Sequence, residues 1–153
     1  MMNYFTRYQA HRLLKKLERV EPAEIEKFSF DGITTMAKVA RVYDGDTITI
    51  VFEFKGEMIK YSCRINGLDT PEIRTKDLEE KKRGYAARDF LKSYIDDKII
   101  KVDLLKFDKY GRLLANVYAN VGGTYMDMTQ MMIRENHAVA YFGGNKAEAH
   151  KKK

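Results

Sequence analysis

The sequence predicts one α+β domain, mostly β, in which five short strands form a Greek-key barrel that carries short helices. Three observations lead to this prediction. At 153 residues, the chain has the length of a single domain that buries about 70% of its unfolded surface. Runs of alternating apolar residues, separated by glycine-containing turns, indicate short strands joined as hairpins. One segment with helical periodicity, residues 78–95, lies between the third and fourth of these strands.

The strands are expected where apolar residues alternate between turn signals. In the second strand Ile48, Ile50 and Phe52 lie on one face, as in a strand with one side buried. A short helix is expected after Asp127, a plausible N-cap. Five mostly hairpin-linked strands with a helix between the third and fourth match a barrel of the oligonucleotide-binding type. The expected elements are strands at 37–43, 47–54, 58–65, 99–105 and 113–119, helices at 78–95 and 128–135, and a last extended piece at 139–142.

The N-terminal segment predicts a separate amphipathic helix over residues 6–19. Thr6 and Gln9 have the spacing of a capping box, and a stripe of apolar residues follows at roughly helical spacing. We therefore divide the chain into three parts. These are an N-terminal helical extension (1–35), a barrel domain (36–145) and a basic tail (146–153).

The charge and the cysteine content of the chain indicate its partner and its cellular compartment only weakly. The net charge is +6, which favours a polyanionic partner, but half of the excess lies in the basic tail. The single cysteine, Cys63, excludes an internal disulfide and fits a reducing compartment. No apolar run has the length of a membrane span and no secretory signal is visible. We expect an intracellular protein that has no membrane partner.

The chemistry is concentrated in a turn after the third strand. Asp69, Thr70, Pro71 and Glu72 follow one another there. Pro71 disfavours the helical conformation at Thr70, so the Thr70 carbonyl is presented between two carboxylates. Asp46, in an earlier turn, adds a third acid. No histidine or cysteine cluster accompanies these oxygen ligands, which favours Ca²⁺, with Mg²⁺ as the alternative.

Two arginines accompany the acids. Arg64 precedes the acidic turn and Arg112 lies in the loop between the last two barrel strands. Their planar guanidinium groups suit bidentate phosphate contacts. A metal, an acid and two arginines around one point would make a site for phosphodiester hydrolysis.

Three motifs in this order resemble those of the staphylococcal nuclease (thermonuclease-like) family. They are Val-Tyr-Asp-Gly-Asp-Thr at 42–47, Gly-Leu-Asp-Thr-Pro-Glu at 67–72 and Asp-Lys-Tyr-Gly-Arg at 108–112, and the similarity covers residues 38–141. The resemblance implies that Asp46, Asp69 and the Thr70 carbonyl bind Ca²⁺. It implies Glu72 as the general base, or as the residue that orients the attacking water. The resemblance also implies phosphate contacts from Arg64 and Arg112, and substrate contacts from Lys109, Tyr110 and Tyr141.

The resemblance implies a calcium-dependent endonuclease that hydrolyses DNA and RNA. We expect it to prefer single-stranded or breathing regions and to leave 3′-phosphate and 5′-hydroxyl ends. The alternative is a non-catalytic nuclease-like module that binds nucleic acid or protein. Such modules typically lose the acid and arginine positions, whereas this sequence has all of them.

The ends of the chain depart from the family pattern. Members usually continue into a C-terminal helix that packs on the barrel, and we expect no full helix after Tyr141. We therefore hypothesise that residues 6–20 replace this helix. They would pack either on their own barrel or on that of a partner in a homodimer.

Overall fold

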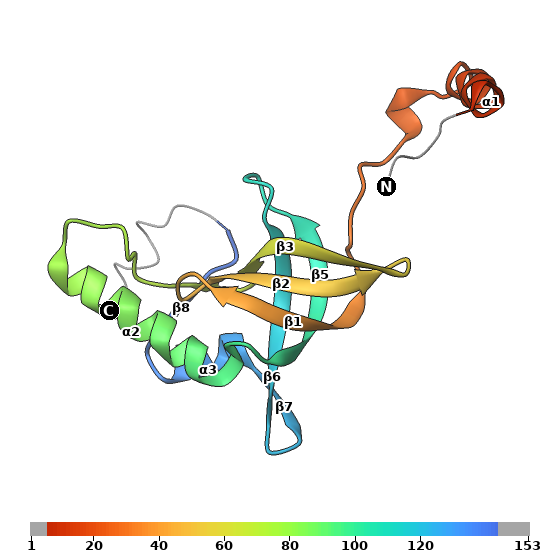
Figure 1. The fold of residues 1–153 in the computed structure, drawn as a ribbon. Helices are drawn as coiled ribbons and strands as arrows, with labels where there is room; N and C mark the ends of the chain where they lie inside the picture. Colours follow the sequence, from red (N-terminus) through yellow and green to blue (C-terminus); the bar gives the residue numbers. More distant parts are fainter. Residues whose placement is uncertain (1–5, 144–153) are drawn as a thin grey trace.

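The computed structural model describes residues 6–143 and is shown in Figure 1. Helix α1 (Arg7–Leu17) and the short 3₁₀ turn η1 (Pro22–Glu24) come first. The strands within this range are β1 (Thr34–Val42), β2 (Thr47–Phe54), β3 (Glu57–Ile65), β4 (Leu68–Asp69), β5 (Ile99–Phe107), β6 (Leu113–Val121), β7 (Thr124–Asp127) and β8 (Val139–Ala140). Two further helices are α2 (Leu78–Ile95), between β4 and β5, and α3 (Met128–Arg134), between β7 and β8.

The predicted five-stranded barrel is confirmed. Strands pair in the order β3-β2-β1-β5-β6, and a parallel pairing of β3 with β6 closes the ring. Strand β7 extends the sheet beyond β6, and β4 pairs with β8 in a separate two-stranded sheet. The sequence analysis did not predict β4 or β7 as strands, because both are too short to show an apolar alternation.

Helix α2 covers part of the barrel through a stripe of small and aliphatic side chains. It begins and ends at the predicted residues and is not interrupted at Gly84. Gly84, Ala87, Leu91 and Ile95 are its buried residues, and they recur every three or four positions on one face. Burial of each large aliphatic side chain contributes about 1.5–3 kcal/mol. The stripe therefore fixes α2 against the barrel.

The N-terminal helix does not pack on its own barrel. The predicted Thr6–Gln9 capping box is formed, but no residue of α1 is buried. Leu13, Leu14 and Leu17 are 42%, 59% and 55% exposed, and Figure 1 shows α1 at the end of a linker, away from the barrel. The hypothesis that residues 6–20 brace their own barrel is therefore wrong. No helix within residues 6–143 has both the length and the apolar character needed to span a membrane.

Candidate active site

The three predicted motifs meet around one small pocket of about 180 Å³. They arrive from the β1–β2 turn, the end of β3 and the segment after it, and the β5–β6 loop. Strand pairing brings these segments together, because β2 pairs with β3 and β3 pairs with β6. The residues that line this acidic pocket are Asp44, Asp46, Arg64, Thr70, Pro71, Glu72, Tyr110 and Arg112.

Arg64 lies between the two carboxylates that were predicted to bind metal. Its Nη2 is 3.3 Å from Asp46 Oδ2 and 3.2 Å from Asp69 Oδ1. The three side chains are only 11%, 8% and 2% exposed. Burial raises the pKa of Asp46 to about 6, against the opposing effect of the Arg64 charge and with a smaller contribution from Asp44. The buried acid pair therefore favours a positive charge beside it.

The donor set suits a hard divalent cation. Asp46 and Asp69 offer carboxylates within reach of a single guanidinium group. Asp46 and the buried Thr70 line the acidic pocket, and the buried Asp69 lies behind its lining, next to Arg64. Neither histidine nor cysteine is among the lining residues. No cage of three or more acidic, histidine or cysteine side chains forms among residues 6–143. A cation held here would take its remaining ligands from water or phosphate, as Ca²⁺ and Mg²⁺ readily do.

The β1–β2 turn fixes the orientation of Asp46. Asp44 Oδ1 accepts hydrogen bonds from the backbone N–H groups of Asp46 at 3.1 Å and Thr47 at 2.8 Å. Thr47 Oγ1 donates to Asp46 Oδ1 at 2.9 Å. Asp44 is thus the side chain that closes the turn, and it holds in place the acid that points into the pocket.

Asp108 anchors Arg112, a role that the sequence analysis missed. Asp108 Oδ2 accepts a hydrogen bond from Arg112 Nε at 2.8 Å, and Oδ1 accepts from the backbone N–H groups of Tyr110 and Arg112. Burial alone would raise the pKa of Asp108, but these bonds outweigh it and the pKa is lowered. Arg112 is held through Nε, and its Nη1 lies 3.4 Å from Thr47 Oγ1. The available sequence signal was an acid two residues before a Tyr-Gly turn.

Glu72 lies at the exposed rim of the pocket, on a loop that rests against α2. Its backbone N–H donates to Glu80 Oε1 at 3.3 Å. Gly84 allows the close approach: a Cβ atom there would lie 2.7 Å from the Pro71 carbonyl oxygen and 3.1 Å from that of Glu72. The sequence analysis assigned no role to Gly84. Its role is to let the helix contact the loop backbone that carries Glu72.

We therefore expect Gly84→Ala to lower kcat by roughly 10²-fold, because the loop that carries Glu72 would have to move away from α2. By contrast, the higher helix propensity of alanine would by itself stabilise the folded protein by about 1 kcal/mol. Steady-state kinetics and thermal unfolding distinguish the two effects. Arg83→Ala, at the exposed neighbouring position, is the control and should keep wild-type kcat. A Gly84→Ala protein with a raised Tm and full activity would contradict this role.

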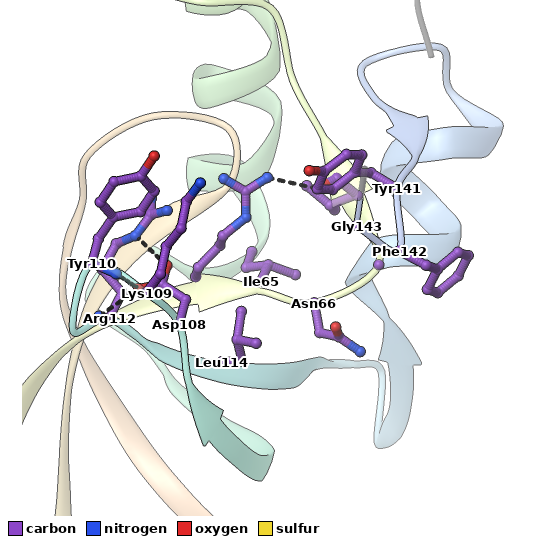
Figure 2. A pocket seen from close by; sticks show the side chains of 13 residues that line it. Ile65, Asn66, Asp108, Lys109, Tyr110, Arg112, Leu114, Tyr141, Phe142 and Gly143 are labelled. Carbon is purple, nitrogen blue, oxygen red and sulfur yellow. Dashed lines mark hydrogen bonds and ion pairs between the residues drawn. The ribbon is translucent and has the colours of Figure 1, made fainter. Parts of the chain in front are cut away.

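A larger pocket of about 540 Å³ adjoins the acidic one. Figure 2 shows Lys109, Tyr110 and Arg112 on one side of it and Tyr141 and Phe142 on the other. The Arg112 guanidinium carbon is 5.6 Å from the Tyr110 ring centroid, and that of Arg64 is 5.8 Å from the Tyr141 ring centroid. The predicted substrate-contacting residues thus lie around one cavity. Aromatic rings beside cations can hold a flat group next to an anion.

Comparisons with known proteins identify the family of the chain. The family model described as staphylococcal nuclease homologue matches residues 62–153. An uncharacterized endonuclease of Escherichia coli is 35% identical over 106 residues, covering 68% of this chain and 60% of the relative. A thermonuclease of Staphylococcus hyicus is 35% identical over 83 residues, covering 53% of this chain and 47% of the relative. Endonuclease Htp3 of Saprolegnia parasitica is 28% identical over 130 residues, covering 77% of this chain and 62% of the relative.

The chain spans less than two thirds of the length of each of these relatives. The family match nevertheless covers more than half of the chain, and the closed five-stranded barrel carries the three motifs at one site. These findings show that the chain belongs to the staphylococcal nuclease family.

Proposed function

We propose that this protein is a calcium-dependent endonuclease that hydrolyses phosphodiester bonds in DNA and RNA. The observation that carries this proposal is the buried Asp46–Asp69 pair bridged by Arg64. Asp46 and Arg64 line a pocket together with Glu72 and Arg112. A structural ion pair would need neither an exposed acid nor a second arginine beside it. The names of the relatives as endonucleases and thermonuclease support the same reaction.

In the proposed mechanism Glu72 accepts a proton from the attacking water, or orients that water toward phosphorus. Arg64 and Arg112 donate hydrogen bonds to phosphate oxygens whose negative charge grows in the transition state. Asp46, Asp69 and Thr70 would hold Ca²⁺, which when bound supplies further charge neutralisation at the phosphate. Asp108 keeps Arg112 oriented through Nε. The water oxygen bonds to phosphorus and the bond from phosphorus to the 5′ oxygen breaks. The leaving oxygen takes a proton from solvent, so the products have 3′-phosphate and 5′-hydroxyl ends.

The substrate we propose is single-stranded or locally melted nucleic acid. The larger pocket, with Tyr110, Tyr141 and Lys109, offers aromatic surface and positive charge. Stacking on aromatic rings does not select a base sequence. A base inside a stable duplex is not available to such a pocket, so single strands and breathing regions would be cut first.

Cleavage assays in different metals test the choice of cofactor. We expect cleavage of single-stranded DNA in millimolar Ca²⁺ and its loss in excess chelator. Two protein carboxylates in the first coordination shell predict a calcium affinity toward the weak end of known sites. An intracellular enzyme with such a weak calcium site would be inactive at the low Ca²⁺ concentration of the cytosol. Full activity in Mg²⁺ with none in Ca²⁺ would contradict the proposed ion.

A non-catalytic module that binds nucleic acid is the second candidate. We also propose that two copies of the chain form a homodimer through α1, because Leu13, Leu14 and Leu17 form an exposed apolar face on this helix. Cleavage in the metal assay separates the enzyme from the module. Sedimentation of the full chain measures the oligomeric state.

A further inference from the structure

A third pocket adjoins the acidic one, and its residues Arg41 and Tyr43 have no part in the mechanism above. It measures about 330 Å³ and lies on the outer surface of the barrel. We call it the Tyr43 pocket. Asp44 and Arg112 line both it and the acidic pocket, so the two are neighbours. The residues that line the Tyr43 pocket are Arg41, Tyr43, Asp44, Thr47, Thr49, Ser62 and Arg112.

The three pockets follow one another along β3. Ser62 lines the Tyr43 pocket, Arg64 lines the acidic pocket, and Asn66, just after the strand, lines the larger pocket. Alternate residues of a strand point to the same face and are about 6.7 Å apart. That step is comparable to one nucleotide of an extended strand. A single strand running along this face would meet the three pockets in turn.

The strand register places Arg41 on the face of the sheet that carries Ser62. Arg41 pairs with Thr49, and Thr49 pairs with Ser62, so the three residues form a row across β1, β2 and β3. A bulge in β1 between Val39 and Arg41 shifts the register just before this row. Bulges near functional sites commonly re-aim a side chain. Here Arg41 directly follows the bulge, is exposed and lines the Tyr43 pocket.

Positive charge is concentrated around the Tyr43 ring. The Arg41 guanidinium carbon lies 5.4 Å from the ring centroid, and that of Arg74 lies 5.3 Å from it. The acid of this pocket, Asp44, already accepts backbone hydrogen bonds through Oδ1. Two cations on one ring repel each other, and a phosphate between them would relieve that repulsion.

We propose that the Tyr43 pocket binds the nucleotide next to the scissile phosphate, on the side away from Tyr110 and Tyr141. Tyr43 contacts its sugar or base, and Arg41 and Arg74 contact the following phosphate. This inference rests on the proposed nuclease function and deepens it. The substrate is a strand that extends on both sides of the cut, as an endonuclease requires and an enzyme that removes terminal nucleotides does not.

The test compares a single-stranded thymidine decamer with a thymidine dinucleoside monophosphate. The dinucleoside has only the scissile phosphate, so Arg41 has no second phosphate to bind. We expect Arg41→Gln to raise the Kd for the decamer about tenfold, measured by fluorescence anisotropy in chelator. It should also reduce the slope of log K against log salt by about 0.7. The loss in kcat/KM should be at least fivefold larger for the decamer than for the dinucleoside.

Arg134→Gln is the matched control. It removes one positive charge from α3, where Arg134 is 64% exposed and paired with Glu135, outside the three pockets. It should keep wild-type values with both substrates. Equal losses with the two substrates, or the same loss in the control, would overturn the proposal.

The anisotropy arm separates failure of this inference from failure of the proposed function. An unchanged decamer Kd in an Arg41→Gln protein that still cleaves would overturn the subsite and leave the nuclease intact. If Arg41→Gln weakens decamer binding but the wild-type protein does not cleave with any metal ion, the proposed nuclease function is wrong and the proposed binding pocket is supported. A wild-type protein that does not bind the decamer would overturn both.

Discussion

Glu72→Gln is expected to lower kcat by roughly 10²–10⁴-fold, the range for removal of a general base. The change keeps the size of the side chain and removes its ability to accept a proton. Because Glu72 lies at the exposed rim of the acidic pocket, the fold should tolerate it. Nucleotide binding in Ca²⁺ should survive, since neither the buried acid pair nor the two arginines change. Single-turnover cleavage of labelled single-stranded DNA measures the effect.

The control for this variant is Glu79→Gln. It makes the same chemical change in the first turn of α2, at an exposed position that lines none of the three pockets. It should cleave at the wild-type rate. Wild-type cleavage by Glu72→Gln itself would show that another group accepts the proton. If both variants lose activity equally, the loss comes from charge near α2 rather than from the base.

Arg64→Ala is expected to affect both stability and catalysis. Removal of the guanidinium leaves Asp46 and Asp69 buried without their common partner. Breaking a buried pair from one side typically costs about 3–5 kcal/mol, a large share of a total stability of about 5–15 kcal/mol. Loss of one group that stabilises the transition state should lower kcat by roughly 10²–10³-fold in the fraction that stays folded. Urea unfolding and kinetics at low temperature measure the two effects.

Arg112→Ala provides the comparison for Arg64→Ala. Arg112 is more exposed and pairs with Asp108 rather than with the acid pair, so its removal should slow cleavage with a smaller loss of stability. Added Ca²⁺ should raise the Tm of Arg64→Ala more than that of the wild type, because the cation no longer competes with an arginine for the two carboxylates. Equal stability losses in the two variants, with equal responses to Ca²⁺, would argue against the bridging role of Arg64.

The strands of the barrel and the motifs that meet at the acidic pocket could be predicted from the sequence, because strands and turns leave local patterns and the three motifs resemble those of a known family. Alternating residues such as Ile48, Ile50 and Phe52 identify a strand with one buried face, and all three are buried in the structure. Pro71 and the neighbouring acids identify a stiff turn without any knowledge of its surroundings. Such patterns predict elements and turns, and strand pairing then brought the three motifs together.

The parts that sequence analysis missed depend on contacts between distant backbones. The contact of Gly84 with the Pro71–Glu72 loop requires two segments to approach within van der Waals distance, and an absent side chain leaves no pattern to detect. The leucine stripe of α1 was visible, but an apolar face does not specify what covers it. The expected docking on the barrel was therefore wrong. The predicted basic tail, residues 146–153, lies outside the described residues.

The parallel seam between β3 and β6 links assembly of the site to completion of folding. At this seam Cys63 pairs with Leu113, and Arg64 pairs with Leu114. Arg112 directly precedes the paired stretch, so the backbone hydrogen bonds that close the ring also set the distance between the two arginines. Pairings between segments so far apart in the chain carry a high loop-closure cost. A partly synthesised chain that has made only β1 to β3 contains Arg64 without Arg112. If the protein has the proposed function, we expect such a chain not to cleave nucleic acid until the barrel closes.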